Sequence, residues 1–433
     1  MRIVYTRCCG LDVHKKSISA CLLVPDEKGG TRQEVRRFGA MTRDLLLLSE
    51  WLAANQVTHV AMESTGVYWK PVWNILEEHY TILLVNAQHV KAVPGRKTDT
   101  KDCQWIADLL QHGLLHGSFI PPSPIRELRD LTRMRASLRQ DHTSVANRMQ
   151  KVLEDANIKV AAVATDWLGV SGRAILSRLL DGEEDAEKLA QLCRGRLREK
   201  IPEMQMALEG RMTQHHRWML TLLREQLEFL EKQIARLDTR IQDHLCQYQK
   251  AVELCITVPG IEAVAAANII AEIGVDMQQF PSAQHLASWA GLCPGNHESA
   301  GKRLSGKARN GCVWVRRSLC QAAWAASHSK NTYLSAQFRR LAARQGKKRA
   351  IVAVAHTILI ILFHMLKNQQ PYRDLGADYF DRRNAEQLKR SLIRKLEPPR
   401  PSSHCSEPSF LSNRDSLSIF SRESRTQLFA LAT

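Results

Sequence analysis

Four acidic side chains near the start of the chain have the types and spacing that metal-dependent chemistry needs. Asp12 follows one apolar stretch, and Glu63 ends another. A charged carboxylate at the end of a buried strand needs a partner, because burying it alone is costly. Asp99 and Asp102 are three residues apart, which puts both on one face of a helix. If the two apolar stretches are neighbouring strands, the carboxylates can converge on shared divalent cations.

Oxygen-rich clusters of this kind bind Mg²⁺ or Mn²⁺ and are typical of enzymes that cut phosphodiesters. Two cations can activate the attacking oxygen and stabilise the leaving oxygen at phosphorus. A cation is also required here, because four uncompensated carboxylates would repel each other and the substrate. Arg96 and Lys97 precede the second pair of acids and are placed to neutralise DNA phosphates nearby.

Each acid also has a purely structural interpretation. Asp12 can cap a turn, Glu63 can cap the next helix, and Asp99 can cap a helix N-terminus. Helix capping accounts for Asp99 but does not account for the second aspartate, Asp102, three residues later. Sugar kinases and actin-like ATPases also begin with a strand-borne aspartate, but the sequence has no Gly-rich phosphate loop of the kind an ATPase needs.

The elements that must position these acids alternate along residues 1–122. Short β-branched stretches predict strands, and stretches with helical periodicity predict helices. Three prolines at 121, 122 and 124 then break the pattern, because proline removes a donor and fixes the backbone. We therefore predict an α/β domain over 1–122. The expected strands are 17–24, 34–38, 59–62 and 81–85, and the expected helices are 43–54, 68–78 and 103–115.

Residues 123–250 are predicted to form a helical region. The arginine-rich segment 125–150 is interpreted either as a helix along a phosphate backbone or as a solvated helix with ordinary ion pairs. Further on, apolar residues recur at alternating spacings of three and four, as in a coiled coil. We favour a coiled coil between chains over a helical hairpin within one chain, which would bury the same stripe. The stripe consists of Leu220, Leu223, Leu227, Leu230, Ile234, Leu237 and Ile241.

A mainly helical domain is predicted over 251–375. Near its start, residues 258–261 resemble a helix-hairpin-helix turn, in which backbone amides near Gly260 can hold a phosphate. A tight turn without a ligand would use the same Pro-Gly pair. After Asn384 the composition shifts to serine and proline without periodicity, so we expect no fixed structure over 385–433.

The composition favours a nucleic-acid partner. The chain carries 61 Lys and Arg against 44 Asp and Glu, a formal net charge of +17, and such a charge attracts polyanions. None of the eleven cysteines falls in a C-x-x-C pair, so we interpret them as reduced, mostly buried thiols. The apolar run 351–366 is too short to span a bilayer. We expect a cytoplasmic, nucleoid-associated protein that does not enter a membrane.

Three motifs together resemble the transposases of insertion sequence family 110, especially its 1111 subgroup. They are residues 10–15 (GLDVHK), 63–69 (ESTGVYW) and 97–102 (KTDTKD). The resemblance implies an amino-terminal ribonuclease-H-like fold similar to the RuvC resolvase. It also implies that the family's Asp, Glu, Asp, Asp set falls on the four acids named above. Cys103 stands where the family usually has alanine, and this departure does not touch the acids.

The second half of the chain resembles the carboxy-terminal transposase domain of the same family. The resemblance lies in residues 289–294 (WAGLCP) and 298–303 (ESAGKR), with Gly311 and Arg316-Arg317 beyond them. In all it covers residues 7–370.

This second resemblance implies a nucleophilic serine, which best matches Ser299. Ser305 and Ser318 are alternatives, and a plain loop serine is another. The basic residues around Ser299 are expected to hold phosphates and to position DNA without reading its bases. They are Lys302, Arg303, Lys307 and Arg309.

The family resemblance implies excision and insertion of a DNA element through a covalent serine–DNA intermediate. It further implies a homo-oligomer, a dimer or tetramer, with a site shared between subunits, and a noncoding guide RNA. One alternative is a structure-specific nuclease like a Holliday-junction resolvase, which needs the carboxylates but no serine. Another is a non-catalytic scaffold that binds nucleic acid and whose acids only cap helices.

Overall fold

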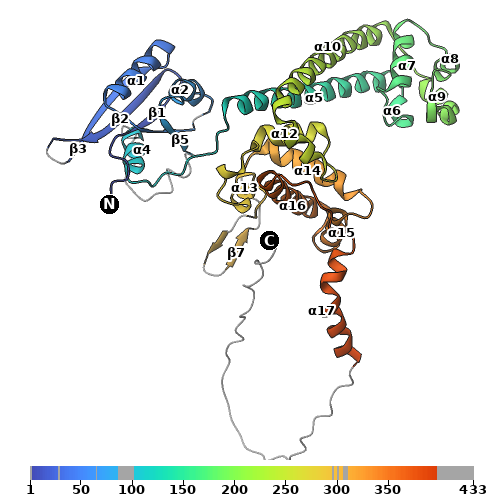
Figure 1. Ribbon diagram of the computed structural model, residues 1–433. Helices are drawn as coiled ribbons and strands as arrows, with labels where there is room; N and C mark the ends of the chain where they lie inside the picture. Colours follow the sequence, from blue (N-terminus) through green and yellow to red (C-terminus); the bar gives the residue numbers. More distant parts are fainter. Residues whose placement is uncertain are drawn as a thin grey trace, which may run out of the picture. The chain divides into compact units, whose positions relative to one another are not determined.

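A computed structural model describes residues 2–27, 30–64, 66–85, 102–294, 297–299, 302–305 and 311–396. The chain divides into two compact units, Met1–Asp378 and Tyr379–Thr433. Within the first unit a sheet region precedes a helical region (Figure 1). The finer domain boundaries expected at 122 and 250 stay predictions.

The sheet region is built on five strands in the order β3-β2-β1-β4-β5. The first three strands are antiparallel neighbours, whereas β4 runs parallel to both β1 and β5. Each strand expected from the sequence is present, and the parallel half brings the ends of β1 and β4 to one edge. The strands are β1 Cys8–Val13, β2 Ser17–Pro25, β3 Thr31–Gly39, β4 His59–Glu63 and β5 Thr81–Val85.

Helices cover both faces of this sheet. On one face, α1 (Thr42–Ala54) and α2 (Trp69–Leu76) pack on alternate strand residues such as Leu11 and Met62. On the other face, α4 (Asp102–Gln111) buries Cys8 and Ala61. Strand side chains alternate between faces, so every second residue of β1 and β4 points toward α4. This α/β layout is consistent with the RuvC-like fold that the sequence implied.

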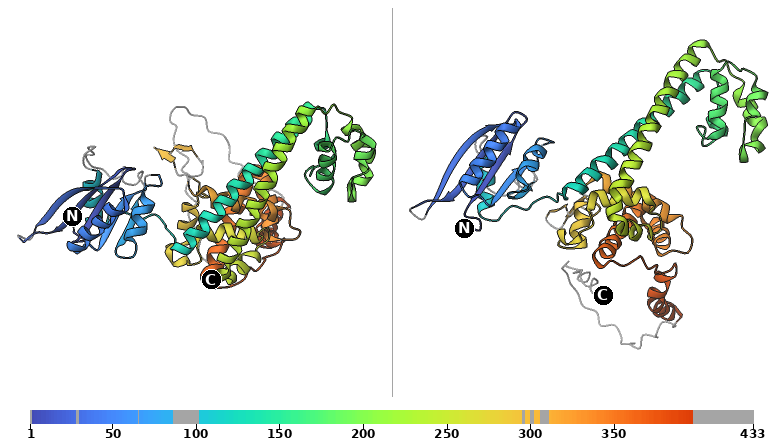
Figure 2. Two further views of the ribbon diagram at one scale, coloured as in Figure 1. Left: turned by 90° about the horizontal axis from the view of Figure 1, so that it is seen from above. Right: turned by 45° about the horizontal axis from the view of Figure 1, so that its top comes forward.

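Two long helices form the frame of the helical region. Helices α5 (Ser123–Asp155) and α10 (Gln214–Leu245) lie side by side in each view (Figure 2). The apolar stripe of α10 is buried against α5 of the same chain, where Met149 and Leu153 share a core with Leu220 and Leu227. The hairpin alternative therefore describes this stripe, and the favoured coiled coil between chains is not supported, because α5 already supplies the apolar partners.

Shorter helices complete the helical region, and a two-stranded hairpin projects from it. The helices are α6 Val160–Val163, α7 Val170–Leu180, α8 Ala186–Ala190, α9 Ile201–Leu208, α11 Gln249–Ile256, α12 Ala263–Ile273, α13 Ala283–Trp289, α14 Val313–Ser327, α15 Tyr333–Gln345 and α16 Lys347–Asn368, with 3-10 turns at Gly195–Lys200, Cys246–Tyr248 and Met277–Gln279. The hairpin consists of β6 His297–Ser299 and β7 Lys302–Ser305.

Helix α16 is long and apolar enough to cross a membrane, judged by length and composition alone. The apolar run 351–366 is part of this longer helix, which extends beyond the run at both ends. Half of its most apolar window is buried inside the chain. Val354, Ile358 and Leu362 belong to the core that α12 and α14 also line, as in the central helix of a folded domain.

In the second unit, α17 (Tyr379–Leu396) is helical across the start of the tail that we expected to lack structure. The expected start of the unstructured tail, at residue 385, was too early. Residues 385–390 are mostly good helix formers and continue the helix. The rest of the tail lies outside the described residues. The ten described cysteines are free, and six of them are buried; their reduced state stays a prediction.

Candidate active site

Asp12 and Glu63 lie next to each other at the edge where β1 and β4 end. The two strands are parallel, and Leu11 is paired with Met62, so the following residues, Asp12 and Glu63, are neighbours across the sheet. Both fall on the face of the sheet that α4 covers, because they follow Gly10 and Ala61 by two residues. The side chains are partly buried, with Asp12 20% exposed.

Helix α4 approaches this edge closely because β1 has a glycine beneath it. A Cβ on Gly10 would lie 2.4 Å from both the Cys103 carbonyl oxygen and the Ala107 nitrogen. Two residues earlier in β1, the Sγ atom of Cys8 lies 3.9 Å from the carbonyl oxygen of Ala107. Helix α4 therefore runs opposite to β1, and its first residue, Asp102, lies toward the end of the strand that carries Asp12.

Asp12 and Asp102 both lie close enough to the Cys103 thiol to affect its pKa. Burial raises the pKa of the Cys103 thiol most, and the negative charges of Asp12 and Asp102 raise it further. Asp12 also contacts the exposed His14, with His14 Nε2 3.1 Å from Asp12 Oδ2. Asp12 and Glu63 thus lie at one edge of the sheet with Asp102 on the helix that covers this face, and the fourth expected acid, Asp99, lies outside the described residues.

The donor set at this edge fits a hard divalent cation, since carboxylate oxygens are the ligands that Mg²⁺ and Mn²⁺ prefer. Among the described residues, no three His, Cys, Asp or Glu side chains come close enough together to hold a metal ion. Strand pairing makes Asp12 and Glu63 neighbours, and metal binding by the four expected acids stays a prediction. Arg96 and Lys97, like Asp99, lie outside the part of the chain that the structure describes.

Ser299 ends β6 of the two-stranded hairpin. It is paired across the hairpin with Lys302, and Glu298 is paired with Arg303. Ser299 and two of its expected phosphate-holding neighbours thus share one small element. Ser305 ends β7, while Lys307 and Arg309 lie outside the described residues.

Ser318, an alternative nucleophile, is not placed for attack. It is 6% exposed in the middle of α14, and its hydroxyl donates to the Trp314 carbonyl oxygen at 3.2 Å. Such a bond to the preceding helical turn is a common structural use of serine. The structure therefore weakens Ser318 as a candidate.

The loop that carries the hairpin is closed at its base by backbone contact. A Cβ on Gly311 would lie 2.3 Å from the Gly291 nitrogen, so only glycine allows this approach. The Cys312 N–H also donates to the Trp289 carbonyl oxygen at 3.2 Å. These contacts give physical roles to Gly291 and Gly311, two glycines of the motifs in the second half of the sequence.

Gly260 has a packing role of the same kind. Its φ of +87° is left-handed, and a Cβ there would lie 2.3 Å from the Ala322 carbonyl oxygen of α14. Both facts require glycine without any ligand. The structure thus favours the tight-turn interpretation of this segment, and phosphate binding near Gly260 stays a prediction.

The arginines at the start of α5 are largely used inside the protein. Arg126 pairs with Glu77, and the Arg126 hydrogen bond lowers the pKa of that carboxyl. Arg133 pairs with Glu272 through Nε at 2.7 Å and Nη2 at 2.9 Å. Arg135 pairs with Asp238. For these positions the interpretation as ordinary ion pairs is correct.

Glu272 is an important residue that sequence reasoning missed. It is 2% exposed and accepts from Arg133, with Arg129 3.5 Å away. The Cys312 thiol also lies 3.2 Å from Glu272 Oε2. Glu272 therefore links α5, α12 and the base of the hairpin loop. The one signal in the sequence is a glutamate within the apolar segment of α12, which is unusual unless the charge is paired.

Both halves of the chain match models of known protein families. Residues 9–158 match a family model described as a transposase. Residues 252–339 match a second model, described as the transposase IS116/IS110/IS902 family. The first range contains the five-stranded sheet and α5, and the second contains α12, the hairpin and α14. Together they cover more than half of the chain.

Individual relatives agree with these matches. A probable family 20 transposase of Pseudomonas aeruginosa is 26% identical over 321 residues, which are 72% of this chain and 85% of the relative. The transposase for insertion sequence element IS1111A of Coxiella burnetii is 25% identical over 300 residues, which are 67% of this chain and 72% of the relative. A pilin gene-inverting protein of Moraxella bovis is 29% identical over 122 residues, covering 28% and 38% of the two chains.

Proposed function

Because the chain belongs to the IS116/IS110/IS902 family of transposases, we propose that it excises and inserts a DNA element by metal-dependent cleavage and rejoining of strands. One observation carries the proposal. The parallel register of β1 and β4 sets Asp12 beside Glu63, on the face where α4 begins with Asp102. A fold with no catalytic use for these residues has little reason to gather partly buried carboxylates at one edge.

The carboxylates of Asp12, Glu63, Asp99 and Asp102 would hold Mg²⁺ or Mn²⁺. A bound cation would lower the pKa of the attacking hydroxyl and would stabilise the negative charge on the leaving oxygen. Gly10 keeps α4 against β1 and so fixes the distance between Asp102 and the strand acids. His14, which lies beside Asp12, would orient that carboxylate within the site.

Ser299 is the proposed nucleophile. Its Oγ attacks a DNA phosphorus, a new Oγ–P bond forms, and the P–O bond to the departing strand breaks. The serine proton passes to a base in the assembled site, and the departing DNA oxygen takes up a proton in turn. In the rejoining step, the hydroxyl of the incoming DNA strand attacks the phosphorus of the serine phosphodiester. The Oγ–P bond breaks, and the serine is free again. Lys302 and Arg303, on the same hairpin, would neutralise the phosphate.

A serine hydroxyl is a weak nucleophile without activation, so the hairpin must meet the acidic edge in the working complex. We propose that this happens between subunits of a homo-oligomer. By the same family likeness, a guide RNA would choose the target by base pairing. The relative named for pilin gene inversion favours recombination between defined sites as the general reaction.

The proposal is tested with a two-plasmid recombination assay in Mg²⁺. Asp12→Ala and Glu63→Ala should each lower recombination at least about 100-fold, since even outer-shell changes at metal sites cost about 10–100-fold. Glu78→Ala is the matched control, because Glu78 is exposed just after α2, and it should stay within about twofold. Recombination that survives both acid substitutions would refute the catalytic assignment.

Ser299→Ala separates the transposase from a junction nuclease. In the transposase, recombination and protein-linked DNA should both disappear, whereas Ser305→Ala should keep both. If Ser299→Ala still cleaves DNA and no protein–DNA adduct can be trapped from the parent chain, the enzyme is a nuclease that uses the carboxylates alone.

A further inference from the structure

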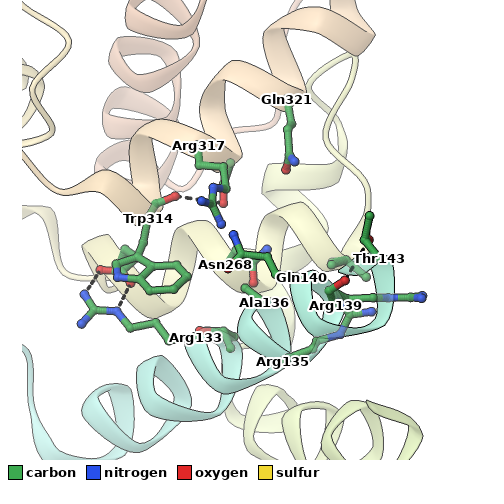
Figure 3. Close-up of a pocket in the computed structure, with 14 residues that line it drawn as sticks. Arg133, Arg135, Ala136, Arg139, Gln140, Thr143, Asn268, Trp314, Arg317 and Gln321 are labelled. Atoms are coloured by element: carbon green, nitrogen blue, oxygen red, sulfur yellow. Dashed lines mark hydrogen bonds and ion pairs between the residues drawn. The ribbon is translucent and has the colours of Figure 1, made fainter. Parts of the chain in front are cut away.

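A cationic pocket lies between α5, α12 and α14, in the helical region. Its volume is about 490 Å³, within the range of ordinary ligand sites. Figure 3 shows arginine side chains from two helices and the Trp314 ring around it. Its inner wall contains buried Thr132, Glu272 and Ser318, whereas its rim is exposed at Arg139 and Arg317. The pocket therefore opens to solvent on a positively charged side.

The arginines of this pocket differ in whether a carboxylate neutralises them. Arg133 is held by Glu272, and Arg135 pairs with Asp238. Within the described ranges, neither Arg139 nor Arg317 has a carboxylate at ion-pair distance. With its amide group flipped, Gln140 accepts hydrogen bonds through its side-chain oxygen from both terminal nitrogens of Arg317, at 2.9 and 3.1 Å. These bonds orient the guanidinium group but do not neutralise its charge. Two positive charges thus remain at the rim for an external anion.

The Trp314 ring adds an aromatic surface beside these charges. The guanidinium carbons of Arg133 and Arg317 each lie 5.6 Å from the ring centroid. Such a set of aromatic and guanidinium planes suits a flat heterocycle. The amides of Gln140, Asn268 and Gln321 surround the same space (Figure 3) and can donate to and accept from a base edge.

We propose that this pocket binds one nucleotide of a single-stranded nucleic acid. The phosphodiester would sit between Arg139 and Arg317, whose guanidinium groups match phosphate oxygens. The base would stack against Trp314. A single strand fits better than a duplex, because only an unstacked base can reach the buried wall of the pocket. This site is separate from the acidic edge of the sheet and needs neither metal nor catalysis.

The test measures binding in EDTA, so that it does not depend on the proposed catalytic site. Labelled single strands of one sequence are prepared as DNA and as RNA, together with the DNA duplex, and binding is followed by fluorescence anisotropy at several salt concentrations. The Arg139→Ala/Arg317→Ala double variant should bind single strands about tenfold or more weakly. The slope of log affinity against log salt should fall by about 0.7 for each phosphate that the variant no longer binds.

Arg240→Ala is the matched control, because Arg240 is exposed on α10 and has no ion pair in the described part of the chain. It should change affinity less than twofold. Trp314→Leu should weaken single-strand binding about tenfold because the base can no longer stack, and Trp314→Phe should restore most of it. Circular dichroism checks that each variant is folded.

Cross-linking locates the base directly. Strands carrying 5-iodouracil, as DNA and as RNA, are irradiated with the protein, and the modified peptide is identified by mass spectrometry. A cross-link on the peptide that contains Trp314 supports the proposal, and the strand type that reacts more strongly identifies the natural source. The proposal is overturned if the double variant binds like Arg240→Ala, if only duplex binding depends on Arg139 and Arg317, or if cross-links fall solely elsewhere.

Discussion

The acidic edge of the sheet and the arginine pocket of the helical region organise charge in opposite ways. At the edge, like charges are brought together by the backbone: adjacent parallel strands end side by side, and each contributes a carboxylate. In the pocket, the arginines come from α5 and α14, which are far apart in the sequence, and two acids, Glu272 and Asp238, neutralise Arg133 and Arg135. The function proposed for the edge would require an external cation, whereas the pocket already contains internal counter-charges and leaves Arg139 and Arg317 at its rim for the proposed anion.

The two regions are therefore sensitive to different kinds of substitution. The acidic edge depends on close backbone contact, which one added methyl group can disturb. The pocket depends on an ion network with low exposure to water, which the removal of one carboxylate can disturb. The following substitutions separate the two kinds of dependence.

The largest effect on stability is expected for Glu272→Ala. Removing this 2% exposed carboxylate leaves Arg129 and Arg133 without their counter-charge, and breaking a buried ion pair costs about 3–5 kcal/mol. Urea unfolding followed by far-ultraviolet circular dichroism measures the destabilisation. Glu262→Ala is the control, because Glu262 precedes α12 and makes no capping hydrogen bond from its side chain. A destabilisation below about 1 kcal/mol would show that the network does not hold the pocket together.

Thiol labelling can show whether that damage stays local. Burial raises the pKa of Cys8 and of Cys21 to about 12, so both should resist iodoacetamide at neutral pH while the sheet region is folded. In Glu272→Ala they should stay protected at urea concentrations that unfold the helical region. Equal loss of protection in both regions would mean that the two regions unfold together.

An intermediate effect is expected for Gly10→Ala. The new Cβ would lie 2.4 Å from backbone atoms of α4, so the helix must move away from β1, at a cost of about 1–3 kcal/mol. Recombination should fall more than stability suggests, because Asp102 moves away from Asp12. Gly30→Ala is a matched control, since a Cβ there meets nothing within 4 Å. Normal recombination by Gly10→Ala would contradict the proposed role of α4.

The smallest effect concerns pH and the pair between Glu77 and Arg126. The Arg126 hydrogen bond lowers the pKa of Glu77 below its ordinary value of 4.5. A carboxyl with a lowered pKa stabilises the fold above the unfolded-state pKa, and that contribution is lost as the pH falls through the folded-state value. Glu77→Gln should therefore cost up to about 1 kcal/mol at pH 7 and little once the pH is below the folded-state pKa. Unfolding free energies across this pH range measure the effect, with exposed Glu78→Gln as control. A cost that does not change with pH would exclude the ionic explanation.

Much of the sheet region could be predicted from the sequence. Strands such as β2 and β4 have largely buried, apolar centres, and most of the strands are hydrogen-bonded to a strand that is close in the chain, so local patterns carried most of the information. The placement of Asp12 and Glu63 at strand ends followed from the same patterns. The contact between α4 and Gly10 could not be predicted, because a glycine in a strand has several explanations until the atom above it is known.

The helical region was harder to predict, because helical periodicity shows that a face is buried but does not show against what. The α10 stripe fits a partner chain and a helix of the same chain equally well, and α5 lies far away in sequence. The arginines of α5 likewise gave no sign of which would be neutralised. Glu272 is more than a hundred residues from Arg133, so the selection between paired and free arginines depends on contacts that no local pattern records.

Local sequence patterns were enough to predict the strands of the sheet, the positions of Asp12 and Glu63 at strand ends, and the family. Only folding established that the leucine stripe packs within the chain, that Gly260 and Gly311 serve backbone packing, and that Arg139 and Arg317 have no carboxylate partner within the described ranges. The physical reason is range: strand alternation and motif spacing are written in neighbouring residues, whereas burial and charge neutralisation depend on residues that only folding brings together.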